Sequence, residues 1–135
     1  MRLTTAMLAD SAQVQGGKLY ILGGGFETIR TRAVPVVHRN INLALIFEVG
    51  PEERNQDLDI VIDLMDEDGK ELGVQARGRL RIAEQPNLPP GASSLVPVAM
   101  PFHNIRFPEA KGYSFVIRGQ DSELGRLGLR VVLLP

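Results

Sequence analysis

Residues 40–49 read NINLALIFEV, and this stretch decides the fold class. Large apolar side chains occupy every second position, and the positions between them hold asparagine, alanine, isoleucine and glutamate. Because successive side chains of a strand point to opposite faces, this period of two predicts a strand with one buried face. The expected buried side chains are Ile41, Leu43, Leu45, Phe47 and Val49.

The same alternation recurs in residues 57–65 (DLDIVIDLM) and, less regularly, in residues 71–82. Residues 66–70 (DEDGK) separate the two stretches and are rich in turn-forming residue types. Two alternating stretches joined by a short polar segment that contains glycine predict a β-hairpin. Its expected inward side chains are Leu58, Ile60, Ile62 and Leu64 on the first strand, and Leu72, Val74, Ala76, Leu80 and Ile82 on the second.

The register of this hairpin follows from matching its two apolar faces, which places Leu64 opposite Leu72. Residues 67–69 then form a three-residue loop whose last residue, Gly69, takes the left-handed conformation. Charged pairs on the outer face favour register and solubility, at about 0.2–1 kcal/mol each. The register predicts two such pairs, Asp59 with Arg77 and Asp57 with Arg79.

The two ends of the chain also predict strands. Residues 113–117 and 127–133 alternate on either side of a turn-rich segment, residues 119–123, and predict a C-terminal hairpin. The N-terminal segment contains alanines and a methionine that favour helix locally. It allows a strand or one short helix, and we favour a strand at residues 3–9.

Together these segments predict an all-β chain. The prolines of residues 83–95 indicate a loop, and Pro97 and Pro101 fit an edge strand, because proline cannot donate a backbone hydrogen bond. Short strands at regular spacing, with no long helical period, are typical of a sandwich. We therefore expect one domain over residues 1–135, an antiparallel β-sandwich of about seven to eight strands, immunoglobulin-like or C2-like.

The composition is that of a soluble globular protein, with 135 residues and 44% hydrophobic side chains. Its 15 Lys+Arg and 16 Asp+Glu give a net charge of -1, so neither nucleic acid nor a membrane is an expected partner. The absence of cysteine removes disulfides and thiolate chemistry and favours a reducing compartment. No apolar run near the N-terminus is long enough for a signal-peptide core, so we expect a cytoplasmic location.

Charge is nevertheless segregated along the chain. Residues 51–71 contain nine acids, whereas residues 28–47 contain three arginines and no acid. Solvated strand faces and loops account for most such runs. A functional interpretation would be electrostatic orientation of a partner. The three arginines are Arg30, Arg32 and Arg39.

Residues 23–25 are three glycines that follow the apolar run of residues 19–22. Glycine-rich loops that bind phosphate open a helix, whereas the following residues 26–29 (FETI) are strand-like. We therefore expect a bulge, a crossover or a close approach of two backbones at this turn. A small-ligand site at residues 23–25 remains an alternative.

Residues 66–68 place three carboxylates at one end of the predicted hairpin, and calcium prefers such oxygen ligands. The nearby Asp57, Asp59 and Asp63 do not join them, because they are spread along a strand at about 6.6 Å or more. A charged hairpin is the favoured interpretation, and a calcium site at residues 66–68 is the alternative.

The sequence contains no arrangement that indicates catalysis. The histidines, His38 and His103, have no carboxylate or second histidine at ligand spacing, and no serine lies in a G-x-S-x-G motif. A hydrolase needs a nucleophile, a base and an orienting group held together. We therefore expect a non-enzymatic protein with no cofactor and no metal.

Apolar side chains at outward positions are the remaining functional signal. The last strand becomes apolar on both faces after Arg130, as a strand covered on both sides would be. The cover would come either from the N-terminal segment or from another subunit. We therefore expect function through protein contact, as a homo-oligomer or an accessory subunit. The candidate contact residues are Ile46, Val116, Val132 and Leu134, with Val132 and Leu134 foremost.

Residues 17–25 read GKLYILGGG, and this motif resembles a family of small bacterial all-β domains of unknown function. Shorter matches lie at Asp68-Gly69, Phe107-Pro108 and residues 112–115 (GYSF). The resemblance covers nearly the whole chain. It implies a free-standing bacterial cytoplasmic protein with an all-β core, and it implies no activity and no catalytic residue.

Overall fold

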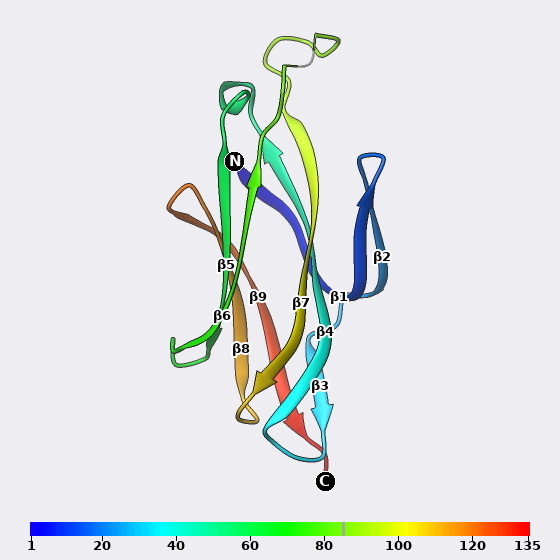
Figure 1. Cartoon of the computed structure of the whole chain (residues 1–135), viewed down its shortest axis with the longest axis vertical. Helices are drawn as coiled ribbons and strands as arrows, with labels where there is room; N and C mark the ends of the chain where they lie inside the picture. Colours follow the sequence, from blue (N-terminus) through cyan, green and yellow to red (C-terminus); the bar gives the residue numbers. More distant parts are fainter. Residues whose placement is uncertain (85) are drawn as a thin grey trace.

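The computed structural model describes residues 1–84 and 86–135, and the described chain is all-β (Figure 1). A four-stranded sheet has the order β2-β1-β4-β7, and a five-stranded sheet has the order β3-β9-β8-β5-β6. The strands are β1 (Arg2–Gln15), β2 (Lys18–Gly24), β3 (Thr28–Thr31), β4 (Val36–Val49), β5 (Leu58–Asp66), β6 (Glu71–Leu80), β7 (Ser94–Phe107), β8 (Gly112–Gly119) and β9 (Ser122–Leu133), with a 3-10 turn η1 (Pro51–Glu53) between β4 and β5.

The core lies between the two sheets, as the alternation predicts. The inward side chains of β4 and β5 are at most 1% exposed, and all of them except Val49 and Leu58 belong to one apolar cluster. Aromatic contacts join the sheets, because Phe102 of β7 lies 5.2 Å from Phe115 of β8, and Phe107 of β7 lies 4.9 Å from Tyr113 of β8, between ring centroids. The all-β class is confirmed, and the two sheets are consistent with a β-sandwich.

Two features of the expected architecture are wrong. The described residues form nine strands, not seven to eight, and the pairing is not purely antiparallel. Strand β3 runs parallel to β9, with Ile29 opposite Val131. Period-two alternation gives the face of each side chain but not the direction of the partner strand. A parallel partner such as Val131, far along the chain from Ile29, therefore leaves no signal in β3 itself.

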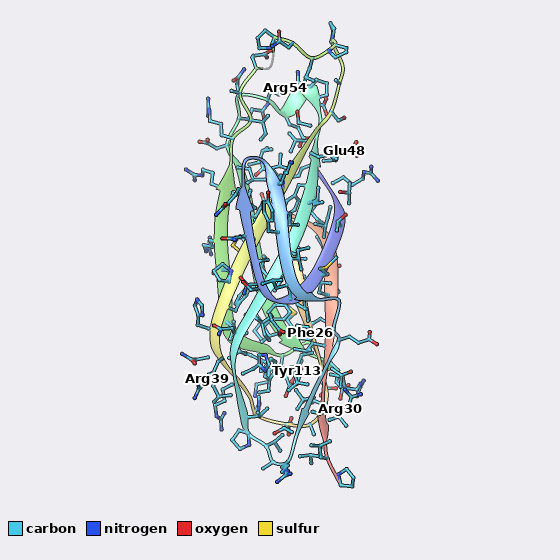
Figure 2. The ribbon with its side chains drawn as sticks, turned by 90° about the vertical axis from the view of Figure 1, so that its right-hand side faces the viewer. Phe26, Arg30, Arg39, Glu48, Arg54 and Tyr113 are labelled. Carbon is cyan, nitrogen blue, oxygen red and sulfur yellow. The ribbon has the colours of Figure 1, made fainter. Side chains whose placement is uncertain are left out.

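The N-terminal segment is a strand, as favoured, but it is longer than residues 3–9. It pairs with β4 as far as Ala9 opposite Asn42, and its second half forms a hairpin with β2. Gly16 and Gly17 close this hairpin with φ of 57° and 74°, the positive pair typical of a type I′ turn. Figures 1 and 2 show the hairpin lying over the outer face of the four-stranded sheet.

The β5–β6 hairpin follows the predicted register only near its turn. Met65 lies opposite Glu71, and Gly69 has a φ of 82°, so the predicted loop at residues 67–69 is confirmed. The next paired position is Asp63 opposite Gln75. Between these two pairs β5 spans two residues whereas β6 spans four, so β6 contains a bulge of two extra residues. The bulge contains Gly73, whose φ is 73°.

This bulge changes the predicted ion pairs. Arg79 lies opposite Asp59 and donates to it from Nε at 2.9 Å. Arg81 donates to Asp57 at 3.1 Å. The prediction of Arg77 opposite Asp59 is therefore wrong, and Arg79 is not directly opposite Asp57, although its Nη1 lies 4.0 Å from Oδ2 of Asp57.

Two further expectations for individual strands are confirmed. Strand β7, with Pro97 and Pro101, is an edge strand that pairs with β4. Strands β8 and β9 form the C-terminal hairpin. In the loop predicted at residues 83–95, residue 85 lies outside the described residues, and β7 already begins at Ser94. Within the described chain, no helix has the length and apolar character needed to cross a bilayer.

Candidate functional site

The four candidate contact residues have different surroundings. Val132 and Leu134 are 37% and 42% exposed, and Ile46 is half-buried. Val116 is fully buried, so the expectation of an exposed side chain there is wrong. It lies on the outer face of the five-stranded sheet, opposite Asp63 on one side and Arg126 on the other. Long charged side chains cover apolar neighbours with their stems, and this accounts for its burial.

The glycine turn is a crossover with a close backbone approach, as expected. Gly23 and Gly25 have φ of 64° and 89°, which glycine adopts without strain. A Cβ at Gly23 would collide with the carboxylate of Asp10. Gly25 donates its N–H to the carbonyl of Leu8 at 2.8 Å, and the chain then passes to β3 in the other sheet.

Backbone hydrogen bonds to the Asp66 side chain hold the conformation of the acidic loop, residues 66–70. Oδ1 of Asp66 accepts N–H groups from Asp68 at 3.0 Å and Lys70 at 2.9 Å. The pKa of the Asp66 carboxyl is lowered from its ordinary value of 3.8, chiefly by the hydrogen bond from Lys70. Partial burial opposes this lowering, and the hydrogen bonds from Lys111 and Asp68 add to it.

A lysine ammonium occupies the space among these carboxylates. Lys111 Nζ lies 3.1 Å from Asp66, 3.5 Å from Asp68 and 2.8 Å from Glu109. Its pKa is raised, first by the hydrogen bond to Glu109 and then by that to Asp66. Across residues 1–84 and 86–135, no three His, Asp or Glu side chains are arranged to hold a metal ion.

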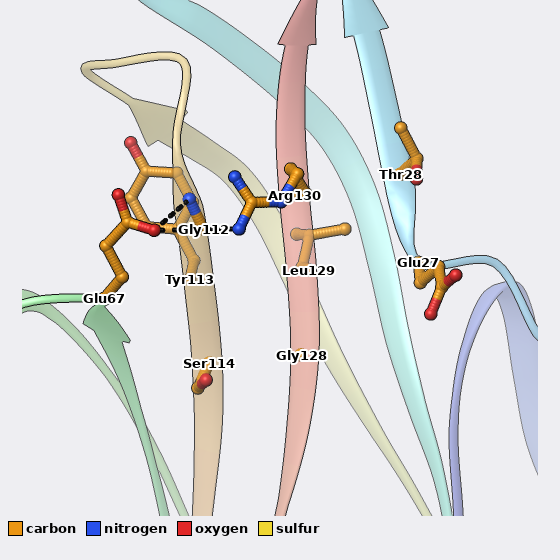
Figure 3. A pocket seen from close by; sticks show the side chains of 9 residues that line it. All are labelled: Glu27, Thr28, Glu67, Gly112, Tyr113, Ser114, Gly128, Leu129 and Arg130. Atoms are coloured by element: carbon orange, nitrogen blue, oxygen red, sulfur yellow. Dashed lines mark hydrogen bonds and ion pairs between the residues drawn. The ribbon is translucent and has the colours of Figure 1, made fainter.

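A shallow depression of about 460 Å³ lies on the outer face of β8 and β9, where Gly112 and Gly128 carry no side chain (Figure 3). Glu67 spans its mouth, lying 3.7 Å from Arg130 and accepting the N–H of Gly112 at 3.3 Å. The hydroxyl of Tyr113 is already used, because it donates to the carbonyl of Glu109 at 2.7 Å. The depression is thus lined by the Glu67–Arg130 ion pair together with the polar side chains of Glu27, Thr28 and Ser114.

Two adjoining hollows, of about 550 and 430 Å³, lie where the β1–β2 hairpin leaves the four-stranded sheet. Both are lined by Asp10 and His38, so they adjoin at these two residues and we treat them as one candidate surface. The ring of His38 lies 6.5 Å from that of Phe26, and the two form an aromatic wall. We name this surface the hairpin groove, and it comprises Asp10, Gly23, Phe26, Arg30, His38 and Arg39.

Residues 4–132 match the family described as "Family of unknown function (DUF6941)". The chain belongs to DUF6941. A search of curated proteins found no match. Family membership therefore assigns no activity to the DUF6941 chain, and its function has to be argued from its own surface.

Sequence reasoning missed the β1–β2 hairpin of this DUF6941 chain, although a signal for it is present. Gly16-Gly17 lies between alternating segments, and a two-residue glycine pair there is a strong indication of a hairpin turn. The hairpin groove was found in part, because the glycine turn at residues 23–25 forms one wall of it. His38 was considered only as a metal ligand or a catalytic residue, whereas it lines the groove beside Phe26.

Proposed function

We propose that the protein is non-enzymatic and acts through protein contact, by joining the β2 strands of two copies into one continuous sheet. The observation that carries this proposal is the free edge of β2. It is unpaired along residues 19–24 and displays Tyr20 and Leu22, which are 52% and 73% exposed. A cytoplasmic setting without nucleic acid or membrane partners remains part of the proposal, in keeping with the net charge of -1.

The four edges of the two sheets differ in their protection against further pairing. Natural edges are blocked by charged residues, prolines, bulges or short length. Strand β7 contains Pro97 and Pro101, and β3 has four residues. Strand β6 contains the Gly73 bulge and alternating arginines. From Leu19 to Gly24, β2 has neither a charged residue nor a proline, so it is the edge best suited to accept another strand.

The turn geometry shows which backbone groups are free. In a two-residue turn, Gln15 and Lys18 hydrogen-bond across the hairpin. Because the hydrogen-bonding direction alternates along an extended strand, Leu19 and Ile21 direct their N–H and C=O groups to the free edge, and the alternation ends at Gly23, whose φ is positive. Leu19 and Ile21 supply the backbone pairing in the proposed dimer.

A two-fold axis through Ile21 gives a consistent antiparallel register. Ile21 then pairs with Ile21 of the second copy through hydrogen bonds, and Leu19 lies opposite Gly23. Tyr20 lies opposite Leu22 of the second copy, at a non-hydrogen-bonded pair where side chains approach most closely. Both copies would withdraw from water the two most exposed large hydrophobic side chains of the hairpin.

A second copy is the occupant we propose because this edge is complementary to itself. An isologous contact repeats every charge across the axis, so a charged edge would repel its own copy. Only Lys18 is charged on β2, and it lies at the end of the strand. The exposed Val132 and Leu134 offer a shorter surface, because Val132 is already paired with Arg30 of β3 and Leu134 lies beyond the end of β9 at Leu133.

Size-exclusion chromatography with light scattering tests the proposal. The wild type should elute as a dimer with concentration-dependent dissociation, and Ile21→Pro should be monomeric with an unchanged far-UV circular dichroism spectrum. Proline fits this position because the N–H of Ile21 faces the free edge and makes no bond within the hairpin. A monomeric wild type, or a dimeric Ile21→Pro variant, would contradict the proposal.

A second variant guards against unfolding by proline. Leu22→Lys adds a positive charge to each strand at the axis and should raise the dissociation constant at least tenfold. Leu95→Lys is the matched control, because Leu95 is 66% exposed and lies on the proline-containing edge strand β7. Val132→Asp tests the C-terminal surface. If Val132→Asp abolishes the dimer and Leu22→Lys does not, the contact lies at β9 and not at β2.

A further inference from the structure

The hairpin groove contains a second unpaired strand edge, distinct from β2. Strand β1 pairs with β4 only from Asn42 to Glu48, whereas β7 pairs with β4 from Val36 to Val49. The side of β4 that faces away from β7 is therefore without a strand partner over residues 36–41, within the described chain. Asn42 marks the departure of β1, because its Nδ2 donates to the carbonyl of Asp10 at 3.1 Å.

Two strands line the groove from different sheets. Val36 and His38 come from β4, and Thr28 and Arg30 come from β3. Strand β3 pairs with β9 on one side only, so its other edge is also unpaired in the described residues. The groove therefore lies between two strand edges. An extended peptide fits such a slot, because it can hydrogen-bond along an exposed edge.

The glycine turn allows the base of the β1–β2 hairpin to pack closely on β1, and this packing sets the width of the groove. A Cβ at Gly23 would meet Asp10, and a Cβ at Gly24 would meet Ile21 and Met7. The absence of both Cβ atoms lets the hairpin base pack closely on β1. Larger residues would push the hairpin outward and change the mouth of the groove.

The charge of the groove indicates which peptide it would accept. Arg30 and Arg39 line it, and Figure 2 shows them on either side of Phe26, below the hairpin. In residues 1–84 and 86–135, neither guanidinium has a carboxylate within 4.0 Å, whereas Arg79, Arg118 and Arg126 each have one. Asp10 is the one acid among the lining residues of the two hollows. Two arginines without acidic partners favour an anionic ligand.

We propose that the hairpin groove binds an extended acidic peptide segment of a partner protein, which adds as a strand along residues 36–41 of β4. Its backbone pairs with the free edge of β4. Its carboxylates bind Arg30 and Arg39, and an apolar side chain packs on Phe26 and His38. This site is separate from the β2 edge, so each can exist without the other.

Fluorescence anisotropy with a fluorescein-labelled eight-residue peptide of alternating glutamate and valine tests this proposal. The acidic peptide should bind, and binding should weaken as salt rises. A matched peptide with lysine in place of glutamate should bind at least tenfold more weakly. Absence of binding by the acidic peptide at millimolar protein, or equal binding of the two peptides, would overturn the proposal.

Variants of the protein locate the site. Arg30→Gln and Arg39→Gln should each weaken binding of the acidic peptide by about tenfold, the loss expected for one charge-assisted contact at a partly exposed site. Arg126→Gln is the matched control outside the groove, and it should leave the affinity unchanged. An equal loss in all three variants would mean that the peptide responds to general surface charge, and the groove would be excluded.

A modified peptide separates strand addition from charge attraction. Methylation of alternate backbone nitrogens removes the hydrogen bonds of one peptide edge and keeps every carboxylate. Of the two possible methylation frames, one should abolish binding and the other should preserve it, because only one frame presents its N–H groups to β4. If neither frame affects binding, the peptide does not add as a strand and the proposal fails.

Discussion

Nη1 of Arg118 lies 2.8 Å from Oδ2 of Asp63 on the outer face of the five-stranded sheet. The other carboxylate oxygen of Asp63 accepts a hydrogen bond from Gln75 at 2.7 Å. These contacts link β8, β5 and β6 across the sheet, and Asp63 is 9% exposed. Asp63 thus connects three strands on an outer face that the sequence alternation predicts to be exposed to solvent.

Removing this carboxylate should destabilise the protein. Asp63→Ala leaves Arg118 and Gln75 without their acceptor, so we expect a loss of about 1–3 kcal/mol in the free energy of unfolding. Asp63→Asn keeps an acceptor and should lose less. Urea unfolding measures both values. If Asp63→Ala costs no more than Asp59→Ala, whose ion pair with Arg79 is exposed, the linking role of Asp63 is wrong.

The acidic loop should make stability depend on pH. The pKa of Asp66 is lowered in the folded state, so its stabilisation is fully present above the unfolded pKa, about 4, and is lost as pH falls through the folded pKa. The melting temperature of the wild type should therefore decrease when the pH is lowered below about 4. Asp66→Asn should melt lower at pH 7 and show a smaller further drop on acidification. Parallel pH profiles for the two proteins would contradict this role.

The β6 bulge should depend on a left-handed residue at position 73. Gly73 has a φ of 73°, and a Cβ there would meet no atom within 4 Å, so a substitution acts through backbone strain alone. We expect Gly73→Val to cost about 1–2 kcal/mol and Gly73→Asn to cost less, because asparagine tolerates this conformation. Chemical denaturation compares the variants. Equal stability of Gly73→Val and wild type would mean that the bulge rearranges freely.

The shared core should be sensitive to truncation. Phe47 is fully buried between the sheets, and Phe47→Ala should cost about 3–5 kcal/mol. Leu95→Ala, at a position 66% exposed, is the control and should stay close to wild type. Urea unfolding again gives the values. A loss at Phe47 no larger than at Leu95 would place Phe47 outside the core.

The alternation of β4 and β5 was sufficient to predict which side chains form the core, because burial of one face fixes the side-chain period. Register beyond the β5–β6 turn was not predictable, since the Gly73 bulge inserts two residues on β6 without breaking the alternation of its faces. The parallel β3–β9 pairing was also beyond reach, because its two strands are far apart in the chain.

The functional surface was predicted only in part. Val132, Leu133 and Leu134 are 37%, 46% and 42% exposed, so parity does not account for exposure at the end of β9, and Val116 has the outward parity of Val132 but is buried. Parity gives the face of a side chain and not what covers that face. The free edge of β2 required the strand order, because a sequence does not show which strands lie at the ends of a sheet.

The most direct test of the central claim is disulfide trapping across the β2–β2 axis, which the absence of native cysteine makes unambiguous. The account predicts that a mixture of Tyr20→Cys and Leu22→Cys chains forms a covalent dimer under mild oxidation, and that each chain alone forms far less, because Tyr20 faces Leu22 of the second copy. Equal trapping in the mixture and in the separate chains, or no trapping at all, would contradict the proposed edge-to-edge contact.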